Sequence, residues 1–140
     1  MATYLILGLL AALAVFAGYV RLAPSDPARW HAMPPVDGPA GVVVPGTGSA
    51  TLRLAGDGAA LLARLDAVAM ATPRTRRLAG SVGEGRITWV TRSALWGFPD
   101  YTTAEVLPDG LQALARLRFG KSDLGVNAAR LRAWAAALAP

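Results

Sequence analysis

The chain has 140 residues and a formal net charge of +5, with no cysteine and one histidine, His31. This composition excludes disulfides, thiolate nucleophiles and cysteine metal sites, and the nine acidic residues form no pair at helical spacing, so we expect no metal, no cofactor and no catalytic residue. The basic excess favours anionic neighbours such as lipid headgroups or nucleic acid, and it is too small to choose between them.

Residues 1–21 are expected to form a transmembrane anchor. The first 20 residues carry no charged side chain, which is long enough for a helix to cross about 30 Å of hydrocarbon. Tyr4 and Tyr19 suit the two interfaces, and Arg21 can reach the headgroups. A cleaved signal peptide is the competing interpretation, because residues 12–14 read Ala-Leu-Ala. The lack of any Lys or Arg before the apolar run favours an uncleaved anchor.

Residues 22–48 are expected to form a spacer rich in proline and glycine. Six of the ten prolines lie here, which disfavours a long helix or a central strand and makes the segment semi-extended. Such a spacer would hold the following domain away from the bilayer. Arg29, Trp30 and His31 interrupt it with an amphipathic patch, which either rests on the headgroups or docks against the domain. Trp30 is therefore a candidate contact for a partner.

Residues 49–140 are predicted to form one α+β domain. Residues 50–55 alternate as a strand does, Asp57 can cap a following helix, and Pro73 ends that helix. Four strands and a final helix follow, and this order predicts an antiparallel sheet of about five strands with two helices packed on one face. The expected ranges of these four strands and of the final helix are 75–82, 86–92, 101–107, 111–119 and 123–138.

The turn before the final helix is rich in polar residues. Ser122 or Asp123 can accept hydrogen bonds from the first free amides of the helix, and Asp123 also favours its positive end. Lys121, next to a helix N-terminus, predicts a candidate anion site. The sequence Gly120-Lys121-Ser122 lacks the spacing and the preceding parallel strand of a phosphate loop, so we reject nucleotide hydrolysis.

Asn127 falls on the apolar stripe of the final helix. A buried amide without partners costs roughly 2–7 kcal/mol, so its partners are expected to be the turn backbone or Asp100. Arg118 and Arg130 can form an ion cluster with Asp100 and Asp123. The candidate residues for binding an anion or a ligand are Arg92, Asp100, Arg118, Lys121, Ser122, Asp123, Asn127 and Arg130.

Two other features bear on partners. Leu95, Trp96 and Phe98 lie in a loop between two strands, and they form either a core plug or an exposed contact for lipid or protein, which makes Trp96 and Phe98 candidate partner contacts. Three arginines within residues 74–77 form a basic run of the kind found at solvated strand ends. This run lacks the interleaved aromatic residues that single-stranded nucleic acid prefers, so we expect no nucleic-acid partner.

Two motifs resemble those of a known family. Residues 89–100 read Trp-Val-Thr-Arg-Ser-Ala-Leu-Trp-Gly-Phe-Pro-Asp, and residues 118–127 read Arg-Phe-Gly-Lys-Ser-Asp-Leu-Gly-Val-Asn, with Arg130 following. Over about residues 50–138 the chain resembles the bacterial and plastid domain of unknown function 1499. That family is functionally uncharacterised. The resemblance implies a small protein of the envelope or the thylakoid lumen, placed behind a membrane helix or a lipid anchor.

The chain departs from the family pattern at several positions. Ala115 and Leu117 stand where the family commonly has serines, and Ala128 stands where it has a basic residue. Hydroxyl chemistry at those positions is therefore not expected to be essential. Residues 44–49 lack the cysteine that many members carry in this segment, so any role of that cysteine is lost.

The side of the membrane is indicated by two opposing signals. Arg21 and Arg29 follow the span, and the positive-inside rule then favours a cytoplasmic C-terminus. The family resemblance instead implies the periplasmic face. We adopt the second indication and expect a single-pass protein of the bacterial inner membrane with a periplasmic domain.

Two functional hypotheses follow from the sequence. The first is a membrane-anchored, non-catalytic envelope domain that binds a partner protein or an anionic lipid, including an accessory subunit of a membrane complex. The alternative is a small-ligand carrier or enzyme with a pocket between the sheet and the final helix. The polar wall of that pocket would consist of Arg92, Asp100, Arg118, Asp123 and Asn127.

Overall fold

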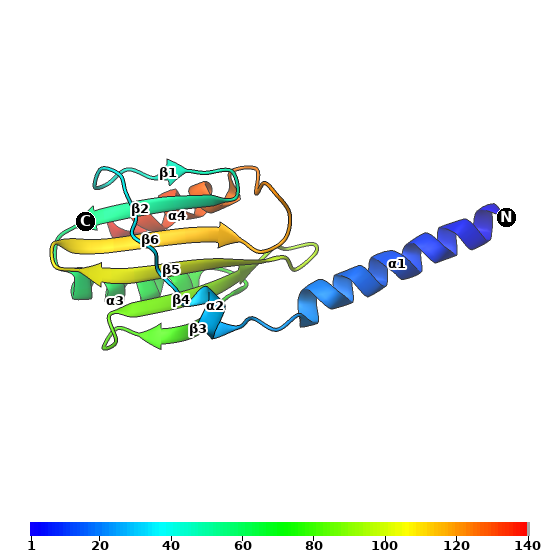
Figure 1. Ribbon diagram of the computed structural model, residues 1–140, viewed down its shortest axis with the longest axis horizontal. Coiled ribbons are helices and arrows are strands. Elements are labelled where there is room, and N and C mark those ends of the chain that lie inside the picture. Colours follow the sequence, from blue (N-terminus) through cyan, green and yellow to red (C-terminus); the bar gives the residue numbers. More distant parts are fainter. Residues whose placement is uncertain (140) are drawn as a thin grey trace.

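The computed structural model describes residues 1–139, and Figure 1 shows a long N-terminal helix that projects from one end of an α+β domain. The helices and strands, in chain order, are α1 (Ala2–Leu22), α2 (Pro27–Trp30), β1 (Val44–Pro45), β2 (Ser49–Ala55), α3 (Gly58–Ala71), β3 (Thr75–Ser81), β4 (Arg86–Arg92), β5 (Pro99–Leu107), β6 (Gly110–Leu117) and α4 (Val126–Leu138).

The six strands form one antiparallel sheet in the order β1-β2-β6-β5-β4-β3. Helices α3 and α4 both lie behind the sheet in Figure 1 and contact its strands. The predicted α+β class, with two helices on one face, is therefore confirmed. The strand count differs because β1 has only two residues, too few for an alternating pattern to be visible in the sequence.

The local signals in the sequence explain most element boundaries. The carboxylate of Asp57 accepts hydrogen bonds from the amides of Ala59 (3.0 Å) and Ala60 (3.1 Å), so it caps α3 as expected. Helix α4 begins at Val126 and not at Asp123, because Gly125 takes the left-handed conformation with φ of 82° and acts as the N-cap residue.

The main core lies between the sheet and the two helices. Trp89 of β4 and Trp134 of α4 meet edge to face, with ring centroids 5.7 Å apart. Alternate residues of β6 point into this core, as the period-2 pattern predicts. Because Leu131 and Trp134 are buried here, the interface between the sheet and α4 is filled by side chains. The other fully buried apolar side chains of the core include Leu62, Leu65, Ile87 and Leu111.

Residues 23–48, which we call the strap, run across the sheet face opposite α3 and α4 (Figure 1). Trp30 is 6% exposed and stacks on Tyr101 of β5, with ring centroids 4.0 Å apart and 13° between the planes. Val90 and Leu78 complete this second cluster. The structure thus differs from the expected spacer. Proline forbids long helices but not packing, and the strap covers apolar side chains that the sheet would otherwise expose.

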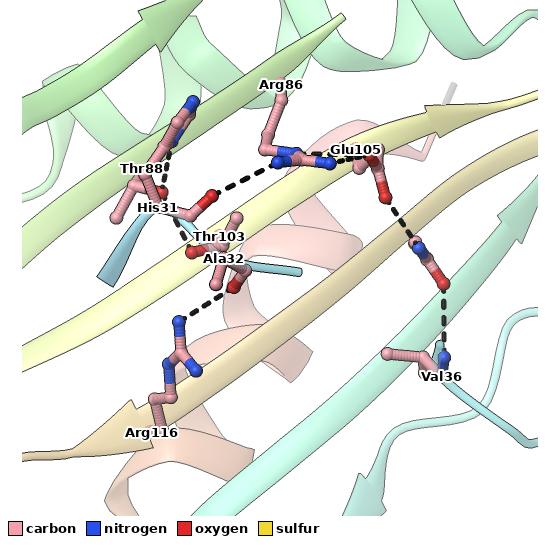
Figure 2. A network of polar contacts seen from close by, with 9 residues as sticks. His31, Ala32, Val36, Arg86, Thr88, Thr103, Glu105 and Arg116 are labelled. Atoms are coloured by element: carbon pink, nitrogen blue, oxygen red, sulfur yellow. Dashed lines mark hydrogen bonds and ion pairs between the residues drawn. The ribbon is translucent and has the colours of Figure 1, made fainter. Parts of the chain in front are cut away.

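Polar contacts fix the position of the strap. Arg86 donates to the carbonyl of His31 (3.3 Å) and pairs with Glu105, and Gln112 links Glu105 (2.9 Å) to the backbone amide of Val36 (3.2 Å). Figure 2 shows these contacts side by side over the outer face of the sheet. Further hydrogen bonds join His31 to Thr88, Thr103 to the carbonyl of Trp30, and Arg116 to the carbonyls of Trp30 and Ala32. The strap is therefore held as part of the folded domain.

Candidate functional site

The C-terminal end of α1 is docked onto the domain. Phe16 meets Phe98 edge to face at 6.1 Å between ring centroids, and Tyr19 meets Phe119 in the same way at 6.0 Å. Val20 is fully buried. These contacts place the end of α1 between the β4–β5 loop and the β6–α4 turn, which face it in Figure 1.

A cleft of about 430 Å³ lies beside this end of α1, and we call it the arginine pocket. It is bordered by the last turn of α1, the residues at the start of β3, the end of β4 and the β4–β5 loop. Among residues 1–139, no acidic side chain lines it. The lining residues are Arg21, Arg74, Thr75, Arg76, Val90, Arg92, Ser93, Ala94 and Gly97.

The arginines of the pocket are held by backbone carbonyls. Arg92 donates to the carbonyls of Val20 (3.3 Å) and Gly97 (2.8 Å), and Arg74 Nε donates to the carbonyl of Arg92 (3.1 Å). Arg21 donates to a carbonyl of the β4–β5 loop, that of Leu95 (2.8 Å). Within residues 1–139, these arginines and Arg76 form no ion pair.

The positive charges of the pocket repel one another. Burial is the largest influence on the pKa of Arg92 and lowers it, whereas the nearby Tyr101 raises it. The positive charges of the neighbouring arginines lower this pKa further; these are Arg76, Arg118 and Arg21. Arginine nevertheless stays protonated at neutral pH. An anion in the pocket would remove this repulsion, and guanidinium groups match the geometry of a phosphate. The site is therefore suited to bind a phosphate-like anion.

The turn before α4 has a different role from the anion site expected there. Asp123 accepts hydrogen bonds from the backbone amides of Gly125 (3.0 Å) and Asn127 (2.8 Å), and Ser122 accepts one from the amide of Leu124 (3.2 Å). The amides of Leu124, Gly125 and Asn127 therefore bond oxygens of the protein itself. They are not available to bind an anion near the exposed Lys121.

Asn127 is fully buried on α4, but its side-chain partner is not the turn backbone or Asp100 that the sequence led us to expect. Its side-chain oxygen accepts a hydrogen bond from Arg130 (2.6 Å), which also pairs with Asp100 of β5 (3.3 Å). Its side-chain nitrogen has no hydrogen-bond partner within residues 1–139. Burial raises the pKa of Asp100, and the charge of Arg130 opposes that rise. Of the ion cluster expected from the sequence, the Asp100–Arg130 pair is present, whereas Asp123 binds backbone amides.

The structure does not bring the five residues of the expected polar wall together between the sheet and α4. Arg92 lines the arginine pocket. Arg118 donates to the carbonyl of Pro24 (2.8 Å) and to the hydroxyl of Tyr101 (3.2 Å), and so helps to hold the strap. Asp100, Ser122 and Asp123 border a second cleft on the other side of α1's end, of about 440 Å³.

The three candidate partner contacts also have distinct positions. Trp30, which belongs to the strap, is buried against the sheet, so the docked alternative of its two expected positions is the one observed. Phe98 is half-buried and contacts Phe16 and Phe119. Trp96 is half-buried in the same loop, next to the exposed Leu95. The loop therefore holds both buried and exposed apolar groups.

No three His, Asp or Glu side chains within residues 1–139 are grouped so that they could hold a metal ion.

Sequence reasoning missed the arginine pocket. Its signal was the alternation of the arginine run, since Arg74 and Arg76 face the pocket while Arg77 pairs with Asp66 of α3.

Residues 23–138 match the family model described as Protein of unknown function (DUF1499). The chain belongs to this family. The DUF1499 match begins at residue 23, the first residue of the strap, whereas the resemblance seen in the sequence begins at about residue 50. This agrees with the packing of the strap onto the sheet. No curated protein and no solved structure matches the chain.

The carboxylate of Asp123 gives the DUF1499 domain a pH-dependent contribution to stability. Burial alone would raise the pKa of Asp123, but hydrogen bonds from the backbone amides of Asn127 and Gly125 hold it below its ordinary value of 3.8. A lowered pKa stabilises the fold above 3.8, and this stabilisation is lost as the pH falls through the lowered pKa. We expect Asp123→Ala to cost about 1 kcal/mol at neutral pH and much less at about pH 2.

The measurement is urea unfolding of the full chain in detergent at both pH values. Ser122→Ala is the matched control, because it removes an uncharged acceptor from the same turn. Its cost should be the same at both pH values. An Asp123→Ala cost that does not change with pH would show that the carboxylate charge plays no part.

Proposed function

We propose that this protein is a membrane-anchored, non-catalytic domain that binds the phosphate of an anionic lipid headgroup in its arginine pocket. The observation that carries the proposal is the arginine pocket itself, lined by Arg21, Arg74, Arg76 and Arg92 and, within residues 1–139, by no carboxylate. Backbone carbonyls hold three of these guanidinium groups but do not neutralise their charge, so the groups repel one another and a bound anion would stabilise the arrangement.

The position of the pocket favours a lipid as the source of the phosphate. Helix α1 is long and apolar enough to cross a membrane, and Arg21 lies in its last turn. A helix of 21 residues is about 31 Å long, close to the roughly 30 Å of a hydrocarbon core, so the end of α1 reaches the headgroups. The pocket borders that end and therefore opens at the depth of the lipid phosphates.

Each Lys or Arg near an anionic membrane surface strengthens the binding of a protein to that surface by about 1 kcal/mol. A partner protein would have to contact the same pocket through phosphate or carboxylate groups. The lipid is already present at high local concentration beside α1. An accessory-subunit role in a larger membrane complex would then use other surfaces of the domain.

We further propose that the domain lies on the periplasmic face of the bacterial inner membrane. The family resemblance supports this orientation, against the indication from Arg21 and Arg29. A single cysteine introduced at the exposed Asp109 should react with a membrane-impermeant maleimide in spheroplasts, since the chain has no cysteine of its own. Reaction only after lysis would place the domain in the cytoplasm.

Lipid binding by the full chain tests the proposal. Native mass spectrometry of the protein in detergent micelles should retain phosphatidylglycerol in preference to phosphatidylcholine. Inorganic phosphate is a separate arm, because it offers the same charge without the acyl chains. Displacement of the lipid by millimolar phosphate would identify a site for a soluble anion. Equal retention of both lipids, with no displacement by phosphate, would overturn the proposed function.

A further inference from the structure

Four apolar side chains lie near the docked end of α1, and we call them the apolar rim: Leu95, Phe98, Leu124 and Val126. Leu95 is 75% exposed, Leu124 is 93% exposed and Val126 is 50% exposed, while Phe98 is half-buried. Leu95 and Phe98 come from the β4–β5 loop, Leu124 from the β6–α4 turn, and Val126 is the first residue of α4. The carbonyl of Leu95 accepts a hydrogen bond from Arg21 of α1. Phe98, Leu124 and Val126 also line the second cleft together with Phe16 of α1.

The contact with Phe16 sets the depth of the rim. Phe16 lies six residues before Leu22, the last residue of α1, so it lies about 9 Å from the helix end at 1.5 Å per residue. Helix α1 is barely as long as the hydrocarbon core and cannot slide outward without drawing apolar residues into water. If α1 tilts while it stays centred in the bilayer, its span along the bilayer normal becomes shorter and Phe16 moves closer to the midplane. The side chains that share its cleft must therefore lie below the level of the headgroups.

Several backbone groups of the rim have hydrogen-bond partners. In the β4–β5 loop, the carbonyl of Leu95 accepts from Arg21 and that of Gly97 accepts from Arg92, and the amides of Gly97 and Phe98 donate to Ser93. In the β6–α4 turn, Ser122 and Asp123 accept from the amides of residues 124–127. Polar backbone groups without partners are costly in hydrocarbon, so the bonded turn can enter more deeply than the loop, where the amides of Leu95 and Trp96 have no partner within residues 1–139.

The two acidic groups near the rim are compensated. Asp100 lies in the second cleft and pairs with Arg130, and the carboxylate of Asp123 is engaged by backbone amides. The exposed Lys121 of the same turn forms no ion pair within residues 1–139, and its long side chain can extend its ammonium group toward the headgroups. Leu124 and Leu95, the most exposed members of the rim, are therefore free to contact lipid.

We propose that the apolar rim inserts into the upper acyl region of the lipid leaflet beside α1, so that the domain sits partly in the membrane and not above it. This inference rests on the proposed function, because it requires α1 to span the membrane. Surface-bound amphipathic elements bury their apolar faces about 5–10 Å into the same boundary, which agrees with the depth of Phe16. Insertion also holds the arginine pocket at the level of the lipid phosphates.

Nitroxide labels on single cysteines test the depth directly, since the chain has no cysteine. Full-length Leu95→Cys and Leu124→Cys variants are labelled and reconstituted in phosphatidylglycerol-containing vesicles. Collision of each label with oxygen, which concentrates in the bilayer, is compared with collision with a water-soluble nickel chelate. Leu9→Cys in α1 is the membrane reference, and Met70→Cys on α3, an apolar residue that is 49% exposed away from the rim, is the control.

We expect the two rim labels to resemble the Leu9 label, with high oxygen and low nickel accessibility, and the Met70 label to show the reverse. If Leu9 lies in the bilayer while both rim labels resemble Met70, the rim inference is overturned and the anchor stands. If the Leu9 label is also in water, the membrane anchor of the proposed function fails as well. Val126→Cys provides a third rim position, and near-ultraviolet circular dichroism verifies that each labelled variant is folded.

Discussion

Replacing Trp30 by alanine is expected to lower the free energy of unfolding by about 3–5 kcal/mol, the usual cost of removing a buried tryptophan. Its ring stacks on Tyr101 and lies 5.2 Å from the guanidinium of Arg116. The change would leave a cavity between the strap and the sheet, beside the ring of Tyr101 and the guanidinium of Arg116. Small domains are stable by only about 5–15 kcal/mol, so most of the stability would be lost.

The measurement is urea unfolding of the full chain in a non-denaturing detergent, followed by tryptophan fluorescence. Trp96→Ala is the control for the loss of an indole, because Trp96 is half-exposed in the β4–β5 loop. It should cost clearly less than Trp30→Ala. Trp30→Phe keeps an aromatic ring against Tyr101 and should fall between the two.

An unchanged unfolding midpoint for Trp30→Ala would contradict the packing of the strap. Residues 23–48 would then act as the spacer that their composition indicates. The family match from residue 23 and the polar network in Figure 2 favour the packed arrangement.

The sequence predicted those features that depend on neighbouring residues. Asp57 caps its helix, α3 ends before Pro73, and the alternating residues of β6 face the core. Each signal is local, because a cap, a proline or a pleat acts within a few positions. The start of α4 was predicted three residues too early, because the left-handed conformation of Gly125 was not anticipated. Two family motifs at residues 89–100 and 118–127 pointed correctly to the family.

The features that the sequence did not predict depend on contacts between distant segments. Trp30 and Tyr101 are 71 positions apart, and no periodic pattern in a proline-rich segment indicates where it will pack. Arg21 and Arg76 meet in one pocket although they come from the anchor and from β3. The run at residues 74–77 could be identified as basic, but only the strand register separates the two arginines that face the pocket from Arg77, which pairs with Asp66.

Replacing Arg74 and Arg76 by glutamine is expected to weaken phosphatidylglycerol binding by about 2 kcal/mol, or roughly 30-fold. Both side chains line the arginine pocket and are exposed, so the substitutions should leave the fold intact. Arg21 and Arg92 are unsuitable for this purpose, because their hydrogen bonds join α1 to the domain. Arg74 also donates to the carbonyl of Arg92, but the amide of Arg92 already bonds the carbonyl of Arg74, so the two segments stay paired without that side chain. The apparent dissociation constant is obtained from native mass spectra of the full chain at increasing lipid concentration.

The matched control changes the same net charge at a distance from the pocket. Arg132 is exposed on α4, which packs on β2 and β6, and Arg53 on β2 pairs with Asp109. The double variant Arg53→Gln/Arg132→Gln therefore removes two positive charges without altering the pocket. Phosphatidylcholine binding should be unaffected in both double variants.

The central claim is that the pocket, and not the overall charge of the domain, holds the lipid. The most direct test is the ratio of the apparent dissociation constants for phosphatidylglycerol in the two double variants. The proposed site predicts a roughly 30-fold loss for Arg74→Gln/Arg76→Gln and less than about threefold for Arg53→Gln/Arg132→Gln. Equal losses in the two variants would contradict the site, because only net charge would then determine binding.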